Sequence, residues 1–167
     1  MSMEWSEWKI KNYGPLGMTV DDILNQPDSS SSKKFASLLY RIDLKPNYES
    51  FTHTERIIRE VWFLFGEVGN GGFDQYFSNG DGDCAKIALS GLKEIGADDA
   101  ASVMSRAMSI FPNGDPFSDE SQALEELDID SYQILQDCDK EMWNLENKTS
   151  ELVLEYARKR KAEIHLP

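Results

Sequence analysis

The sequence predicts an all-α protein, a single compact domain of about seven to nine helices. Three observations point to this fold class. From Lys33 onward, apolar residues recur every three or four positions, which is the period of a helix with one buried face. Capping residues, glycines and prolines divide this pattern into stretches of ordinary helix length. Apart from a weak candidate at residues 5–11, no segment alternates with the two-residue period of a strand.

Residues 1–32 are predicted to form a lead-in with one short helix and a serine-rich loop. Its first part holds aromatic residues and then helix breakers: Trp5, Trp8, Ile10 and Tyr13, followed by Gly14, Pro15 and Gly17. The aromatic side chains could mediate self-association, but a strap across the helical core is the favoured interpretation. Thr19 is a suitable cap for a helix that runs through Asn25 and ends at Pro27.

Residues 33–167 are predicted to form the helical domain. Its first helix carries an apolar stripe and stops before Pro46. Thr52 and Glu55 have the spacing of a capping box, which opens the next helix. That helix contains five consecutive apolar residues at 61–65, so we expect it to be the central buried helix. It should end at the glycines around Asn70.

Five further helices are expected, with a loop at residues 111–117: 83–95, 98–110, 119–127, 130–146 and about 150–164. Gly96 suits the C-terminal position of the first of these, where a left-handed backbone is common. The basic run at 158–161 lies at the end of the last helix, where the helix dipole favours cations.

The chain is strongly acidic, and the acidity is local. It has 17 Lys and Arg against 30 Asp and Glu, a net charge of -13. Residues 70–146 hold 17 acidic and 4 basic side chains and thus account for the whole excess. Ordinary nucleic-acid binding needs a basic surface, so direct contact with nucleic acid is not expected.

The composition also favours a cytoplasmic protein without membrane contact. The longest strictly apolar run, Val61 to Phe65, is far shorter than the roughly 20 residues of a membrane-spanning helix. The first residues carry neither the basic stretch nor the apolar core of a secretory signal. Cys84 and Cys138 lack metal-like spacing, which favours two reduced thiols over a bridge.

Carboxylates on the predicted helices from residue 119 to 146 are candidates for a partner-binding face. Side chains on one face of a helix recur every turn, at about 5.4 Å, so such a face could imitate the phosphates of a DNA duplex. The alternative is a solvated face that serves only solubility. The candidate residues are Asp119, Glu120, Glu125, Glu126, Asp128, Asp130, Asp137, Asp139 and Glu141.

The segment 67–79 is the most distinctive local motif. It combines glycines that permit unusual backbone conformations with aromatic and polar side chains: Glu67, Asn70, Gly71, Gly72, Phe73, Gln75, Tyr76, Phe77 and Asn79. One interpretation is a binding pocket lined by an acid and amides. The other, which we favour, is that the polar groups satisfy the backbone at a tight corner between two helices.

This segment resembles the signature E-V-x-N-G-G-F-x-Q-Y-F-x-N of a bacterial family of uncharacterised domains. The resemblance extends from about residue 50 to about residue 160 and includes the Ile95-Gly96-Ala97 corner. Gly69 departs from the family pattern, in which a second Asn is common. The resemblance implies a helical fold, and the family includes a dimeric, acidic DNA-mimic protein that occupies the DNA-binding surface of a transcription factor.

Other motifs give little support for catalysis or metal binding. A calcium loop starting at Asn79 would need Gly at Cys84 and Glu at Ser90. His53 and His165 have no neighbouring ligand. Glu60 and Glu67 could share a helix face, but arginines within one turn of Glu60 offer ordinary ion-pair partners. We therefore expect no cofactor, no metal site and no enzymatic activity.

The sequence thus predicts a non-enzymatic acidic interaction protein, with a DNA mimic as the narrower hypothesis. Its expected partner is a basic protein such as a DNA-binding regulator, and it could form a homodimer. Two alternatives stay open. One is a small-molecule-binding or catalytic domain with a pocket around residues 67–79, and the other is a toxin-neutralising partner.

Overall fold

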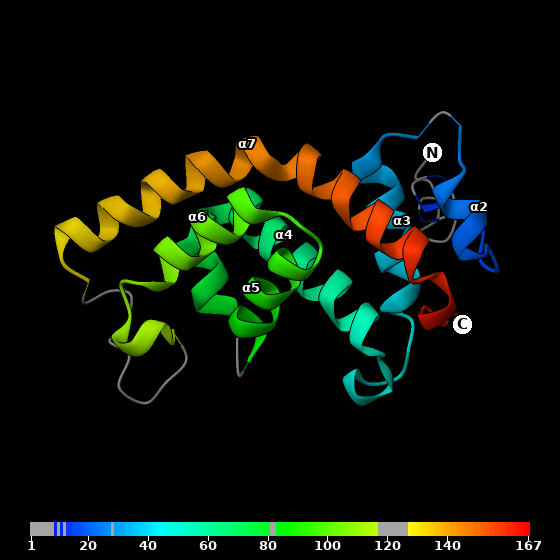
Figure 1. The fold of residues 1–167 in the computed structure, drawn as a ribbon, viewed down its shortest axis with the longest axis horizontal. Helices are drawn as coiled ribbons and strands as arrows, with labels where there is room; N and C mark the ends of the chain where they lie inside the picture. The colour runs from blue at the N-terminus through cyan, green and yellow to red at the C-terminus, as the bar shows by residue number, and fades with distance from the viewer. Residues whose placement is uncertain (1–8, 10, 12, 28, 81–82, 117–126) are drawn as a thin grey trace, which may run out of the picture. The chain divides into compact units, whose positions relative to one another are not determined.

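The computed structural model describes residues 9, 11, 13–27, 29–80, 83–116 and 127–167 (Figure 1). These residues contain no strand, so the all-α prediction is confirmed for them. They form six α-helices rather than seven to nine: α2 (Val20–Leu24), α3 (Ser31–Ile42), α4 (His53–Asn79), α5 (Cys84–Glu94), α6 (Asp98–Met108) and α7 (Ile129–Lys159). Short 3-10 helices occupy Tyr48–Ser50, Pro112–Gly114 and Lys161–Glu163. The helix predicted at 119–127 lies almost wholly outside the described residues.

The chain divides into two compact units. Unit 1 comprises residues 1–59 and 150–167, and unit 2 comprises residues 60–149. Helices α4 and α7 each contribute residues to both units.

In unit 1, polar caps set where the first helices begin. Thr19 and Asp22 form a capping box, with the Asp22 N–H donating to Thr19 Oγ1 at 3.2 Å and the Thr19 N–H donating to the Asp22 carboxylate at 2.8 Å. This confirms the predicted start of α2. The Ser30 hydroxyl accepts from the Lys33 N–H at 3.3 Å, so α3 begins at Ser31, two residues before the expected position. The predicted apolar stripe of α3 is buried.

Arg41 on α3 is an almost fully buried cation that the sequence pattern did not reveal. Its guanidinium donates to the carbonyl of Tyr13 at 3.0 Å and to that of Pro15 at 2.6 Å. Burial lowers the pKa of Arg41. The Tyr13 ring also stacks on Tyr40 with a centroid distance of 4.8 Å. Tyr13 therefore straps onto α3 as expected, whereas Trp5 and Trp8 lie outside the described residues.

A second buried charge, Glu55, opens α4. The Glu55 N–H donates to Thr52 Oγ1 at 3.2 Å, and the Thr52 N–H donates to the Glu55 carboxylate at 2.8 Å, which confirms the predicted capping box. The same carboxylate pairs with Lys45 and accepts from the His165 N–H at 2.7 Å. The Glu55 side chain thus connects the start of α4 to the loop that follows α3 and to the C-terminal residues.

In unit 2, helices α5 and α6 lie side by side (Figure 1). Gly96, at φ +81°, turns the chain between them. The Ala97 N–H donates to the Leu92 carbonyl at 2.8 Å and the Gly96 N–H to the Lys93 carbonyl at 3.1 Å, which is a Schellman motif. The five apolar residues predicted to face inward on α6 are all buried: Ala100, Val103, Met104, Ala107 and Met108.

Helix α7 is continuous over 31 residues, so the prediction of separate helices at 130–146 and 150–164 was wrong. Residues 147–149 contain neither glycine nor proline, and the hydroxyl side chains of Thr149 and Ser150 are buried rather than exposed in a loop. The apolar spacing of residues 130–146 predicts that Tyr132 faces inward with Leu135 and Cys138, but the Tyr132 side chain is 49% exposed, whereas Leu135 and Cys138 are buried. Cys84 and Cys138 form no disulfide, as expected.

Glu55→Gln should destabilise the protein by about 3 kcal/mol at neutral pH, because Lys45 then loses its charged partner in a buried setting. Burial alone would raise the pKa of Glu55, but hydrogen bonds from Lys45, Thr52 and His165 lower it overall. The stabilisation is therefore complete above the unfolded value of about 4.3 and is lost as the pH falls through the lower folded value.

Denaturant unfolding of both proteins from pH 7 downward measures this effect. The difference between wild type and Glu55→Gln should shrink below a pH of about 4.3. The exposed Glu49→Gln is the control and should change stability by less than about 0.5 kcal/mol. A difference in stability between wild type and Glu55→Gln that did not depend on pH would contradict the role assigned to the ionised Glu55 carboxylate.

Candidate functional site

The signature segment 67–79 forms a break within α4. Gly71 (φ −155°, ψ 18°) and Gly72 (φ 78°, ψ −176°) both leave the helical conformation. The backbone of Gly72 lies in a region that is essentially restricted to glycine. The predicted end of one helix near Asn70 and the start of a short aromatic helix correspond to this break.

Helix α7 supplies two side chains to the broken backbone. The Phe73 N–H donates to Asp139 Oδ1 at 2.7 Å, and Trp143 Nε1–H donates to the Val68 carbonyl at 2.9 Å. In a continuous helix, that carbonyl would accept from Gly72, which has left the helical conformation. Asp139 and Trp143 are four residues apart and so lie on the same face of α7. A Cβ at Gly72 would lie 2.9 Å from Asp139 Cγ, so the carboxylate can approach only a glycine here.

The polar residues of the signature bond mainly to one another. Glu67 Oε2 accepts from Gln75 Nε2 at 3.0 Å and from Asn79 Nδ2 at 2.6 Å, which links the two sides of the break. Asn70 is exposed. This arrangement supports the structural interpretation of the signature over a pocket lined by free polar groups.

The aromatic residues of the signature belong to the core of unit 2. Phe73, Tyr76 and Phe77 are buried, and the Phe77 ring meets Phe111 edge-on with a centroid distance of 4.9 Å. Burial, together with Cys84 and Glu60, raises the pKa of Tyr76 far above its usual range. The Tyr76 ring packs against the rings of Phe63 and Phe77 in this core.

The nine candidate carboxylates do not lie together on one face. Asp119, Glu120, Glu125 and Glu126 lie outside the described residues. Asp128 accepts from the Ser131 N–H at 2.7 Å and caps α7, and Asp139 is the half-buried anchor of the helix break. The structure brings the remaining three together on the outer face of α7: Asp130, Asp137 and Glu141.

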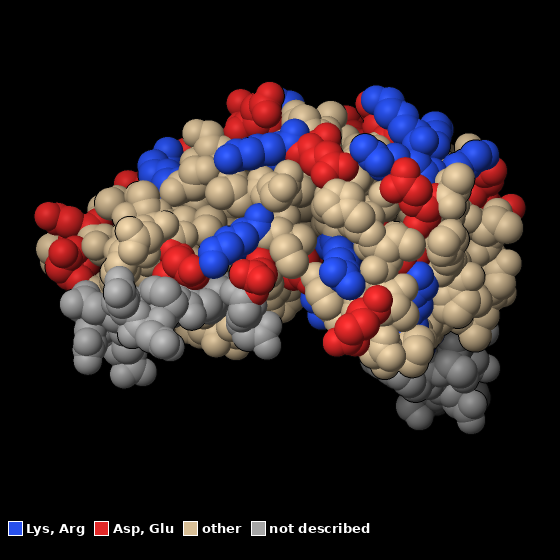
Figure 2. Space-filling model, turned by 60° about the horizontal axis from the view of Figure 1, so that its bottom comes forward, with Lys and Arg blue, Asp and Glu red and all other residues tan. Residues whose placement is uncertain are grey.

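These three carboxylates are exposed, and two of them lie near cations. Asp137 is 3.4 Å from Lys140 Nζ, and Glu141 is 2.7 Å from Arg106 Nη2. On the face shown in Figure 2, acidic side chains stand beside basic ones rather than in a separate patch. The ion pairs are solvent-exposed, so each contributes about 0–1 kcal/mol and can exchange partners.

The charge imbalance follows the division into units. Unit 2 contains 19 Asp and Glu against 5 Lys and Arg, a net charge of −14. Unit 1 contains 11 Asp and Glu against 12 Lys and Arg, a net charge of +1. The whole negative excess of the chain thus belongs to one folded unit, although the described carboxylates do not form a wall free of cations.

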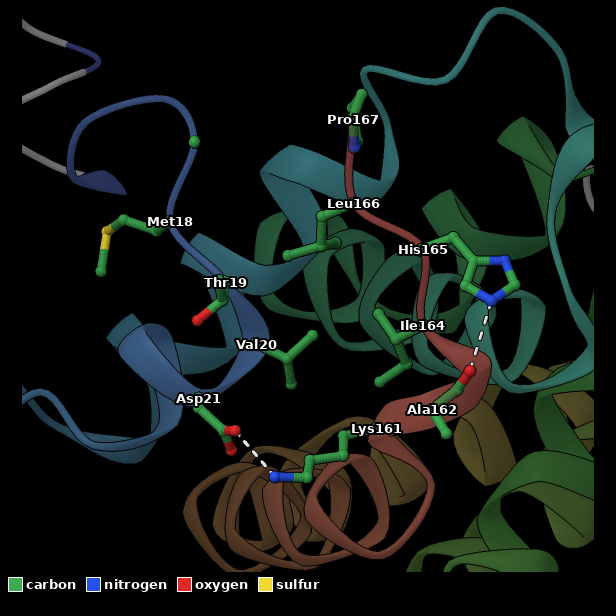
Figure 3. A pocket seen from close by; sticks show the side chains of 11 residues that line it. Met18, Thr19, Val20, Asp21, Lys161, Ala162, Ile164, His165, Leu166 and Pro167 are labelled. Carbon is green, nitrogen blue, oxygen red and sulfur yellow. Dashed lines mark hydrogen bonds and ion pairs between the residues drawn. The ribbon is translucent and has the colours of Figure 1, made fainter.

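Two cavities among the described residues lie away from the signature segment. A cavity of about 660 Å³ in unit 1 lies between residues 17–21 and the C-terminal residues 161–167 (Figure 3). Lys161 Nζ and Asp21 Oδ2, 2.7 Å apart, close one side of it. A shallower hollow of about 370 Å³ in unit 2 is lined in part by Arg106 and Glu141.

Within the described part of the chain, no three metal-binding side chains gather at one place. Over the same residues, every helix is too short or too polar to cross a lipid bilayer.

Gly72→Ala should destabilise the protein by about 2–4 kcal/mol, because alanine is strained at this φ and ψ and displaces the Asp139 carboxylate from the Phe73 N–H. Gly69→Ala is the matched control. Gly69 lies in helical backbone, and a Cβ there meets no atom within 4 Å, so this variant should gain up to about 1 kcal/mol. Denaturant unfolding measures the stability of both variants. Equal effects of the two substitutions would argue against a requirement for glycine at the helix break.

Comparison with known proteins identifies the family of the chain. The family model described as DMP19-like protein matches residues 49–160 of the chain. The matched region includes the helix break, its two anchors on α7 and the Gly96 corner. Neither a curated protein nor a solved structure gives a match. Because the family model covers more than half of the sequence, the chain belongs to the DMP19-like protein family.

Proposed function

We propose that this protein is an acidic interaction protein that binds a basic protein partner and occupies its DNA-binding surface. The observation that carries the proposal is the net charge of −14 on unit 2 beside +1 on unit 1. A field of one sign on a folded unit steers oppositely charged partners toward it. Membership of the DMP19-like family is consistent with a DNA mimic.

The carboxylate row on α7 gives this charge a repeating geometry. Asp130, Asp137 and Glu141 fall within about 40° of one another around the helix, given the turn of about 100° per residue. The row extends over about 16 Å, which is the axial rise of about five phosphates on one DNA strand. A cationic surface built for phosphates would meet carboxylates on a rigid helix, and the weak exposed pairs with Arg106 and Lys140 would give way to it.

The alternatives differ in what supports them. A toxin-neutralising protein would use the same acidic surface, and the identity of the partner decides between the two. A pocket at the signature has no comparable support, because Glu67, Gln75 and Asn79 bond one another. The proposal includes a homodimer. It also includes a cytoplasmic location, because DNA-binding partners act in the cytoplasm of bacteria.

The proposal predicts capture that duplex DNA reverses. The immobilised protein should retain DNA-binding proteins from a bacterial lysate at about 50 mM NaCl, and either added duplex DNA or about 0.5 M NaCl should release them. Neutralising the row with Asp130→Asn, Asp137→Asn and Glu141→Gln together should weaken the affinity for a captured protein at least about tenfold.

The matched control neutralises three exposed carboxylates of unit 1, Glu49, Glu151 and Glu155, and should leave the affinity nearly unchanged. The proposal fails if nothing retained at low salt is displaced by duplex DNA. It also fails if the two triple variants weaken capture equally, because the effect would then reflect total charge alone.

A further inference from the structure

We propose that the acidic surface of unit 2 contains an apolar docking stripe on α7, and that its occupant is a basic amphipathic helix of the protein partner. This inference rests on the proposed function and narrows it. A purely electrostatic mimic would need only carboxylates. The structure adds three large apolar side chains that the core does not absorb: Ile129, Tyr132 and Trp143.

These side chains share one face of α7. Ile129 is 83% exposed, Tyr132 49% and Trp143 54%. At about 100° per residue, they fall within about 60° around the helix. Ile129 and Tyr132 are about one turn apart, and Trp143 lies about 16 Å further along, with the polar Gln136 on the same face between them. Exposed apolar residues that lie singly need no explanation, but an exposed row on one helix face is typical of a docking surface.

Trp143 has the properties of a rigid anchor. Its indole N–H is held by the Val68 carbonyl at 2.9 Å, so the ring is fixed while about half of the side chain faces solvent. Anchors that are fixed before binding lose little conformational entropy when the partner arrives. Tryptophan and tyrosine are also enriched among the residues that dominate binding energy. The helix break therefore positions a side chain for a partner as well as stabilising the fold.

Charges on both sides of the stripe define the occupant. Asp130 and Asp137 follow one edge of the stripe, and Glu146 lies along the other, by their positions around α7. Lys140, 3.4 Å from Asp137, lies between the first edge and the stripe, so that edge carries two carboxylates and one cation. Asp74, exposed just after the helix break, adds to the second edge, because the preceding Phe73 N–H donates to Asp139 on that side of α7 at 2.7 Å. The complement of an apolar stripe between two acidic edges is a helix with an apolar stripe between two basic edges.

The test uses two synthetic peptides as probes. One is an 18-residue helix of about five turns, with leucines on one face and lysines on both flanks. The other has the same composition in scrambled order. Calorimetric titration of the intact wild-type protein should show at least about tenfold tighter binding of the amphipathic peptide. The ratio should persist at about 0.5 M NaCl, because salt screens charges and does not weaken apolar contact.

Variants at exposed positions separate the apolar and electrostatic parts. Ile129→Gln with Tyr132→Gln should remove the preference for the amphipathic peptide. Asp130→Asn with Asp137→Asn should weaken both peptides and keep the preference. The control, Leu16→Gln with Leu44→Gln, changes two exposed leucines of unit 1 and should have no effect.

Equal binding of the two peptides by the wild-type protein would overturn the docking stripe, as would absence of binding to either. A dimer that Ile129→Gln with Tyr132→Gln converts to monomer in sedimentation would overturn it too, because the occupant would be a second copy. The capture experiment and the peptide titration can fail independently of each other. A protein that prefers the amphipathic peptide but retains nothing displaced by duplex DNA would keep the stripe and lose DNA mimicry.

Discussion

Where a helix loses its regular backbone at two adjacent residues, a carbonyl and an amide lose their usual partners. In unit 2 this happens at Gly71 and Gly72, and the two groups that need partners are the Val68 carbonyl and the Phe73 N–H. Both partners come from neighbouring turns of α7. Unit 2 therefore depends on a contact between segments that are more than 60 positions apart in the sequence.

This contact explains why the signature has its composition. Glycine is required at Gly72 by its backbone and by the approach of Asp139, and Glu67 joins Gln75 and Asn79 across the break. The aromatic residues fill the core beneath. The polar and aromatic residues of the motif thus serve the fold of unit 2.

Local signals in the sequence predicted much of the helical structure. The boxes at Thr19 and Thr52 and the glycine at Gly96 act through neighbouring residues, so their effects could be read directly. Long-range contacts could not. Asp139 resembled the other surface carboxylates although it anchors the break, Arg41 gave no sign of burial, and α7 has no glycine or proline to show whether it continues or stops at residues 147–149. The signature predicted a corner between helices but not which distant residues would complete it.

Arg41 has a consequence for the limits of the folded chain. Its guanidinium donates hydrogen bonds to the carbonyls of Tyr13 and Pro15, which precede α2 in the chain. Proteolytic trimming that removed these residues would leave a buried cation facing the space they had filled. The minimal stable protein therefore extends well upstream of residue 49, where the match to the family begins, and unit 1 carries an N-terminal segment that cannot be shortened freely.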